Sequence, residues 1–234
     1  GVKKVVLTSS IVTLPLRRRG QPPSTEADWN TDLRVPYFRA KTLAEQTAWR
    51  LAEELGVKLV TVLPAAIGGS GFVRRTATTD FFEGVMLGSM KMGAPDWVYP
   101  YVDIADVVEG HLLAAESDAS GRFILSNDEA PSIVELTKIL HRLDPSIAVA
   151  PRLIPNFLLP LMPTLDAIGA KFAKTPRVVT PDLVATMRGS IYSVSNQRAK
   201  SELGWQPRVP LEQSLRELLR TLQALRAAGA AACC

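Results

Sequence analysis

Residues 37–69, with the sequence YFRAKTLAEQTAWRLAEELGVKLVTVLPAAIGG, contain the pattern that decides the fold. Apolar residues recur at helical spacing through the first half, and Gly56 follows as a C-terminal helix cap. Residues 57–63 then form a continuous apolar run, typical of a buried strand, which ends at Pro64. The β-branched run at residues 2–7 predicts another strand before the helix. Strand, helix and strand with a short link indicate a parallel βαβ unit.

The same alternation of strands and helices continues downstream. A helix is expected from near Asp103, with that residue as its cap, and GRFILS at residues 121–126 predicts a third strand. Another helix is expected at residues 132–143, beyond which frequent prolines separate short helical pieces. The sequence therefore predicts an α/β portion over residues 1–142 and a small, mainly helical lobe over residues 143–234.

The composition indicates an ordinary globular protein. The chain has 234 residues, of which 47% are hydrophobic and 21% charged, and its net charge is +4. Basic residues are spread out apart from residues 17–19, so the clustered stripe that nucleic-acid binding needs is missing. The most apolar stretch, residues 153–163, is interrupted by prolines and is shorter than the roughly 20 residues of a membrane span. We therefore expect no nucleic-acid partner, no membrane segment and no signal peptide.

Cysteine and histidine are scarce. The two cysteines, Cys233 and Cys234, are adjacent near the C-terminal end, and the two histidines are His111 and His141. These counts predict neither a disulfide framework nor a metal site, and they fit a reducing, cytoplasmic setting. A hydrolase using Ser10 with one of the histidines is disfavoured because no G-x-S-x-G motif is present.

Tyr37 and Lys41 are the strongest candidates for chemistry. Residues four apart share one helical face, although such a pair is more often a half-buried tyrosine beside a solvated lysine. A phenol with a pKa of about 10 is a weak base at neutral pH, and a nearby ammonium lowers that pKa. The pair would then exchange a proton with a carbonyl or alcohol oxygen, which Ser9 or Ser10 at the carboxyl end of the first strand could hold.

Several motifs in the same order resemble the extended short-chain dehydrogenase/reductase family, which belongs to the NAD-dependent epimerase/dehydratase superfamily. The similarity is to its branch of dihydroflavonol-4-reductase-like and aldehyde reductases. The motifs are VVLTSS, TEADW, YFRAKTLAEQTAW, TVLPAAIGG, YVDIADVVEGHLLAAE and AKSELGWQPRVPLEQSL. The resemblance implies a Rossmann-type NAD(P)-binding fold, with residues 143–234 over the substrate. It also implies an oxidoreductase that reduces aldehydes or ketones, or oxidises the corresponding alcohols, by hydride transfer.

The resemblance also implies a role for each matching residue. Ser10 would orient the substrate oxygen, Tyr37 would be the general acid/base, and Lys41 would bind the nicotinamide ribose and lower the tyrosine pKa. Thr8 and Ser9 would line the same ribose. The backbone of Pro64, Ala65, Ala66 and Ile67 would pass the nicotinamide carboxamide. The implied cofactor is NADP, with NAD as the alternative, and the implied partner is a small carbonyl or alcohol compound bound by a monomer or homodimer.

One family feature has no counterpart in this sequence. Family members begin with a strand and a glycine-rich turn that hold the cofactor pyrophosphate, and the glycines at residues 68–71 match a later loop. The resemblance therefore covers about the last two thirds of a family member, and we expect this polypeptide alone to bind a nicotinamide cofactor poorly. Two alternatives stay open: a sugar-nucleotide epimerase or dehydratase, and a non-catalytic binding relative.

Overall fold

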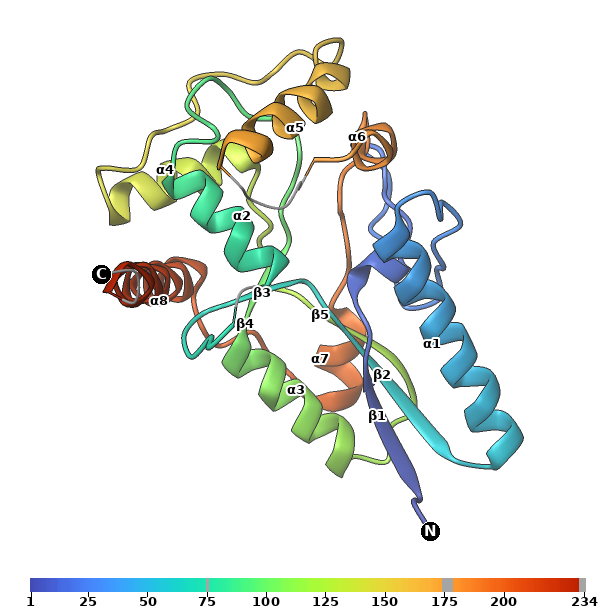
Figure 1. The fold of residues 1–234 in the computed structure, drawn as a ribbon. Helices are drawn as coiled ribbons and strands as arrows, with labels where there is room; N and C mark the ends of the chain where they lie inside the picture. The colour runs from blue at the N-terminus through green and yellow to red at the C-terminus, as the bar shows by residue number, and fades with distance from the viewer. Residues whose placement is uncertain (75, 174–178, 232–234) are drawn as a thin grey trace.

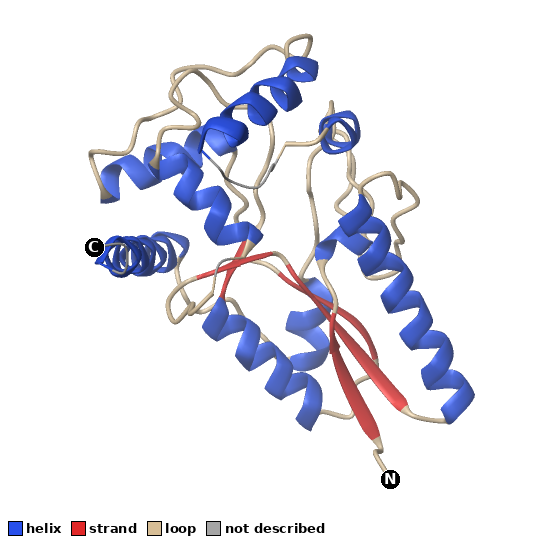
Figure 2. Ribbon diagram, in the orientation of Figure 1, coloured by secondary structure: helices blue, strands red, loops and turns tan. Residues whose placement is uncertain are grey.

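A computed structural model describes residues 1–74, 76–173 and 179–231. Its main sheet has three parallel strands in the order β1-β2-β5, with Lys4 opposite Lys58 and Val60 opposite Gly121 (Figures 1 and 2). The central strand is buried from its second residue to its last, which explains its unbroken apolar sequence. The predicted parallel βαβ unit is confirmed. The strands are β1 (Lys4–Thr8), β2 (Lys58–Pro64) and β5 (Gly121–Leu125).

Helices cover both faces of this sheet. One face carries α1 (Pro36–Leu55), and the other carries α3 (Ile104–Glu116) and α7 (Gln197–Leu203) (Figure 1). The core between them includes Trp205, which is fully buried and donates its indole N–H to the carbonyl of Asp106 at 2.8 Å. The predicted helix from Asp103 is confirmed, and the Asp103 carboxylate caps it by accepting a hydrogen bond from the amide of Ala105 at 2.8 Å.

The side of α1 that packs on the core carries both polar and apolar residues. It ends as predicted at Gly56, which takes the left-handed conformation with φ 62°. Its buried positions are Phe38, Thr42 and Glu45. The apolar residues at helical spacing face solvent instead, since Leu43 is 49% and Leu55 is 72% exposed. The buried side of α1 therefore includes hydrogen-bonding side chains, which the spacing of apolar residues in the sequence did not predict.

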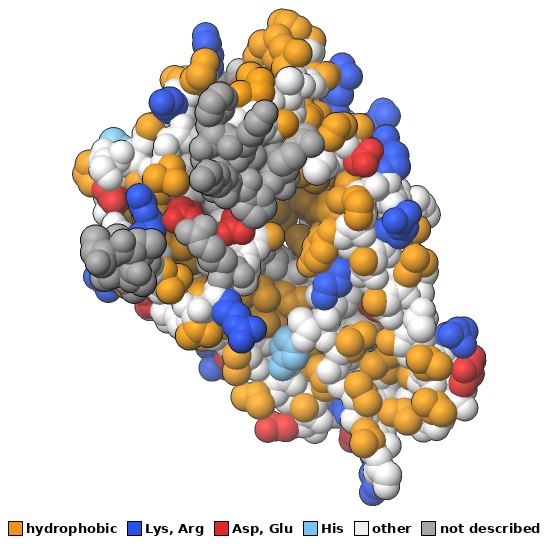
Figure 3. All heavy atoms as spheres, viewed as in Figure 1, with side chains coloured by type: hydrophobic (Ala, Val, Ile, Leu, Met, Phe, Trp, Pro, Cys, Tyr) orange, Lys and Arg blue, Asp and Glu red, His pale blue; other side chains and the backbone are white. Residues whose placement is uncertain are grey.

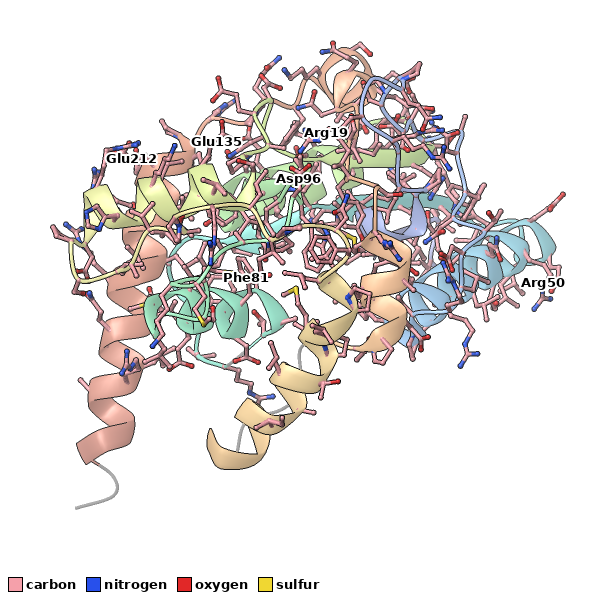
Figure 4. All side chains as sticks on the ribbon, turned by 90° about the horizontal axis from the view of Figure 1, so that it is seen from above. Arg19, Arg50, Phe81, Asp96, Glu135 and Glu212 are labelled. Atoms are coloured by element: carbon pink, nitrogen blue, oxygen red, sulfur yellow. The ribbon has the colours of Figure 1, made fainter. Side chains whose placement is uncertain are left out.

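A second apolar core lies among the helices beyond the end of the sheet, and Figure 1 shows how these helices are arranged. Phe81, labelled in Figure 4, stacks on Tyr99 with the ring centroids 4.6 Å apart. Packing crosses the predicted boundary at residues 142/143, because α2 lies on α8 and α7 lies on β5. The division into two portions stays a prediction. The elements here are β3 (Ala66–Gly68), α2 (Ala77–Met86), β4 (Tyr101–Asp103), α4 (Ile133–Leu143) and α8 (Leu211–Ala231).

Short pieces of helix complete the described chain. They are η1 (Ile11–Thr13), η2 (Leu159–Leu161), α5 (Met162–Ala173) and α6 (Pro181–Met187). None of the helices among the described residues combines the length and hydropathy that crossing a membrane requires. Cys233 and Cys234 lie outside the described residues.

Candidate active site

The carboxyl end of β1 carries the predicted hydroxyl residues. Thr8 is the last residue of the strand, and Ser10 caps η1, its Oγ accepting a hydrogen bond from the amide of Val12 at 3.3 Å. The side chain of Ser10 is partly exposed. Its hydroxyl therefore lies at the edge of the sheet where parallel α/β folds bind their ligands.

Ser9 lies behind this edge. Its amide donates to the carbonyl of Val62 at 2.8 Å, and its side chain is buried. Its hydroxyl donates to Oε2 of Glu45 at 2.6 Å. The side chain of Ser9 is thus not placed to line a ribose as predicted, because it is buried and already bonded within the protein.

The first turns of α1 present Tyr37 and Lys41 at the same end of the sheet. Pro36 begins the helix, where its fixed φ suits the first position and its missing N–H costs nothing. Tyr37 is 53% exposed. The Nζ of Lys41 lies 3.5 Å from the carbonyl oxygen of Thr8. The contact brings the lysine of the predicted pair to the end of β1.

A small apolar cluster holds the turn after Ser10 against the turn of Tyr37. Phe38, next to Tyr37, is 5% exposed, and Val12 follows Ser10 by two residues. The structure therefore brings together the segments that carry all three predicted catalytic residues. The buried members of this cluster are Val12, Val35 and Phe38.

Tyr37 differs from the other three tyrosines, Tyr99, Tyr101 and Tyr192. Burial raises the pKa of all three, and the nearby Tyr37 raises that of Tyr192 further. Among the tyrosines of the chain, Tyr37 is the one with its side chain mostly exposed.

The side chain of Thr8 is bonded to His111. The Nδ1 of His111 lies 2.8 Å from the carbonyl oxygen of Val107, to which it donates, so Nε2 accepts from the Thr8 hydroxyl at 2.8 Å. The other histidine, His141, has Nδ1 2.8 Å from the carbonyl oxygen of Ile147. Neither contact involves Ser10, so the geometry gives a hydrolase no serine–histidine pair.

Residues 64–67 lie at the carboxyl end of β2 and enter β3. The amide of Ala65 donates to Leu125 at 2.9 Å, and that of Ala66 donates to Pro100 at 3.2 Å. Pro64 has no N–H. Because successive amides of a strand point to opposite edges, the Ile67 amide points away from β4. We therefore expect the N–H of Ile67 to be the amide of this segment that can reach a ligand.

The glycines that follow β2 are explained by close packing. A Cβ at Gly68 would lie 1.8 Å from the hydroxyl oxygen of Tyr101, and a Cβ at Gly69 would lie 2.4 Å from Oδ2 of Asp103. Close packing therefore accounts for glycine at both positions, and a role in binding phosphate is not needed to explain them. Asp106 likewise has a structural role, since its carboxylate accepts the amide of Arg208 at 3.0 Å.

The residues at this edge fit the ribose end of a nicotinamide cofactor. An ammonium has three N–H donors, and among the described residues one contact of Lys41, to Thr8, is found. Tyr37, which is mostly exposed, and the partly exposed Ser10 add polar groups on the same side. Within the described residues, no group of three or more acidic, histidine or cysteine side chains is arranged to hold a metal ion.

Two buried charged residues lie behind the carboxyl edge of the sheet, and neither of them was predicted from the sequence as part of the site. Glu45 and Arg122 are 1% and 5% exposed, and Arg122 Nε donates to Glu45 Oε1 at 2.8 Å. Glu45 falls four residues after Lys41 on α1, a spacing that could have indicated a charged residue on the core face. Nothing in the local sequence of β5 identifies Arg122 as its partner, because the pairing depends on the tertiary fold.

The sequence of the chain is similar to those of known proteins. Residues 1–125 match the model of the NAD dependent epimerase/dehydratase family. Tetraketide alpha-pyrone reductase 1 of Arabidopsis thaliana is 34% identical over 160 residues, which cover 64% of this chain and 49% of that protein. Cinnamoyl-CoA reductase CAD2 of Medicago truncatula is 28% identical over 231 residues, covering 95% of this chain and 61% of that protein. The chain thus spans about half to three fifths of these relatives.

Solved structures share the fold. The crystal structure of gox2253 superposes with a TM-score of 0.77 at 24% identity, covering 96% of this chain and 67% of that one. Yeast methylglyoxal/isovaleraldehyde reductase Gre2, complexed with NADPH, gives 0.69 at 19% identity, covering 97% and 65%. The predicted Rossmann-type α/β fold is confirmed.

Proposed function

Because the chain belongs to the NAD dependent epimerase/dehydratase family, we propose that it supplies the proton-transfer residues of an NAD(P)-dependent oxidoreductase. The reaction is reduction of an aldehyde or ketone, or oxidation of the corresponding alcohol. The observation that carries the proposal is the placing of Lys41 and the exposed Tyr37 at the carboxyl end of β1, next to the turn of Ser10.

Each of the three residues has a distinct task. Tyr37 gives a proton to the carbonyl oxygen of the substrate, or takes it from the alcohol. Ser10 donates a hydrogen bond to the same oxygen and fixes its position. Lys41 binds the ribose hydroxyls with the N–H donors that the Thr8 carbonyl leaves available. When bound, the reduced nicotinamide would supply the hydride for carbonyl reduction, and the oxidised form would accept it when the alcohol is oxidised.

The relatives favour reduction over epimerisation. The two relatives compared above are named as reductases, and the yeast structure was solved with NADPH. NADP is therefore the proposed cofactor, with NAD as the alternative. Figure 3 shows a hollow near the centre of one face, with hydrophobic side chains at its walls. Such a surface suits a small carbonyl compound with an apolar or aromatic body.

The test is turnover by the full-length gene product with a panel of aliphatic and aromatic aldehydes and ketones. Oxidation of NADPH that matches alcohol formation one to one supports the proposal. Conversion of a sugar nucleotide without net release of oxidised cofactor would instead identify an epimerase. A protein that binds NADPH in a titration but turns over no carbonyl compound and no sugar nucleotide would be a non-catalytic relative.

A further inference from the structure

Arg122 contacts three separate segments at once. Its side chain is 5% exposed and its guanidinium lies 3.8 Å from the ring centroid of Trp29. Besides the bond to Glu45 on α1, it donates from Nη2 to the hydroxyl of Thr13 at 2.8 Å. Its Nη1 donates to the carbonyl oxygens of Glu26 at 2.8 Å and Asp28 at 2.6 Å. All of its nitrogens are therefore bonded within the protein.

The contact with Thr13 continues to Ser10. The hydroxyl of Thr13 accepts from Arg122 and donates to the carbonyl oxygen of Ser10 at 2.9 Å. The amide of Thr13 donates to the same carbonyl at 3.1 Å. A chain of two side-chain hydrogen bonds thus runs from the guanidinium to the backbone of the residue that is proposed to orient the substrate oxygen.

The contact with Glu45 continues to the neighbouring serine. Oε2 of Glu45 accepts from the hydroxyl of Ser9, and Oε1 accepts from that of Thr61 at 2.7 Å. Burial alone would raise the pKa of Glu45, but Arg122 and the two hydroxyls hold it below its usual value. The group is therefore a carboxylate, and it lies on α1 one turn after Lys41.

A buried ion pair is a costly way to stabilise a core. Taking two charges out of water carries a large desolvation penalty, and well-packed apolar residues in the same place are often as stable or more so. In some proteins such a pair instead fixes one arrangement of the surrounding segments among several. Here the arrangement it fixes is that of β1, η1 and α1, the segments that carry Ser10, Tyr37 and Lys41.

We infer that Glu45 and Arg122 are positioning residues for the reaction proposed above, on which this inference rests. The pair sets the distance between the Ser10 hydroxyl and the Tyr37–Lys41 face of α1. It touches neither substrate nor cofactor. Loss of the pair should lower kcat much more than it changes the KM of NADPH, because small displacements of the reacting groups greatly reduce the rate of the chemical step.

Thr13 offers the mildest test of this inference. Thr13→Val removes the hydroxyl that links Arg122 to Ser10 and keeps the side-chain volume, whereas Thr13→Ser keeps the hydroxyl. In the full-length protein we expect kcat to fall about tenfold for Thr13→Val and to stay within about twofold for Thr13→Ser. A packing role would give the opposite order, since serine loses the methyl group.

Replacing both Glu45 and Arg122 with apolar residues distinguishes an effect on the positions of the catalytic residues from an effect on folding stability. Glu45→Leu with Arg122→Met leaves no unpaired charge, and we expect cooperative unfolding with kcat reduced about 100-fold and the NADPH KM within about threefold. The control is Arg50→Ala with Glu54→Ala, which removes an exposed ion pair on the same helix; Figure 4 labels Arg50. This control should keep wild-type kcat.

Amide hydrogen exchange gives a readout that does not need turnover. The amide of Leu14 donates to the carbonyl of Ile11 within η1, and we expect its exchange to speed up in Thr13→Val and in the double variant while β5 stays protected. Unchanged exchange there, or wild-type kcat in the folded double variant, overturns the inference. An inactive wild-type protein with faster exchange in both variants overturns the proposed function, and it leaves supported only that the pair orders the turn after Ser10.

Discussion

The Nζ of Lys41 on α1 lies 3.5 Å from the carbonyl oxygen of Thr8, the last residue of β1. This contact joins the helix that carries Tyr37 to the strand that leads into Ser10. It also places the ammonium at the carboxyl edge of a parallel sheet, where bound ligands are expected. The proposed chemistry therefore depends on a short stretch of strand and helix that the sequence separates by more than 30 residues.

Replacing Tyr37 with phenylalanine should remove most turnover. The substitution takes away the exposed hydroxyl and keeps the ring, so carbonyl reduction should fall by about 10²- to 10⁴-fold while NADPH binding changes little. Steady-state kinetics and a fluorescence titration of NADPH measure the two effects.

The matched control for that variant is Tyr192→Phe. Tyr192 makes an edge contact with Phe38, with ring centroids 6.4 Å apart, and its phenol has a burial-raised pKa. Since it takes no part in proton transfer in the proposed mechanism, its loss should leave kcat within about threefold of wild type. Full activity of Tyr37→Phe, or equal losses in both variants, would contradict the assignment.

Replacing Lys41 with methionine should weaken the cofactor site. Methionine keeps the length of the side chain but removes the charged donors, and a hydrogen bond from a charged group is worth about 1.5–3 kcal/mol. In the full-length protein the dissociation constant of NADPH should therefore rise about tenfold or more. The exposed cation Arg39, also on α1, provides the comparison: Arg39→Ala should leave that constant nearly unchanged, and a similar rise in both variants would indicate a general charge effect.

Phe38 should matter more for stability than its apolar neighbours on α1. Phe38→Ala empties a buried position and should lower the free energy of unfolding by about 3 kcal/mol. Leu43→Ala, at a side chain 49% exposed, should change it by less than about 1 kcal/mol. Urea unfolding of the two variants measures the difference. Equal losses would mean that the helix buries its apolar stripe, contrary to the structure.

The sequence predicted the elements well because their signals are local. The apolar run of β2, the left-handed glycine after α1 and the capping aspartate of α3 each mark an element through neighbouring residues. The pair Tyr37 and Lys41 was likewise visible as a helical spacing. The sequence did not show which side of α1 packs on the sheet, because the apolar residues that recur at helical spacing lie on its exposed side.

What the sequence could not give is the network behind the site. Glu45 and Arg122 are 77 residues apart, and neither residue identifies the other as its partner in the sequence. Ser9 and Ser10 are adjacent with identical side chains, yet one bonds to Glu45 in the interior and the other caps η1. Such differences follow from strand register and helix docking, which depend on the whole fold.

The polypeptide of 234 residues should bind NADPH weakly, with a dissociation constant above about 1 µM. Tight binding of a dinucleotide needs free amides at a helix N-terminus for its pyrophosphate. In the described residues, α2 is the helix that follows the glycine loop, and its capping box already occupies two of its N-terminal amides. The Thr79 amide donates to Thr76 Oγ1 at 3.2 Å, and the Thr76 amide donates to Thr79 Oγ1 at 2.7 Å.

Calorimetry on this chain and on its Lys41→Met variant tests that prediction. Weak binding that falls further in the variant would show that the ribose contact alone is present. A submicromolar dissociation constant would contradict the prediction, because it would require a pyrophosphate site elsewhere in the chain. The variant distinguishes specific from non-specific binding. Binding at the carboxyl end of β1 depends on the ammonium of Lys41 and should weaken in the variant. Non-specific association with a chain of net charge +4 should hardly change when one of 27 basic residues is removed.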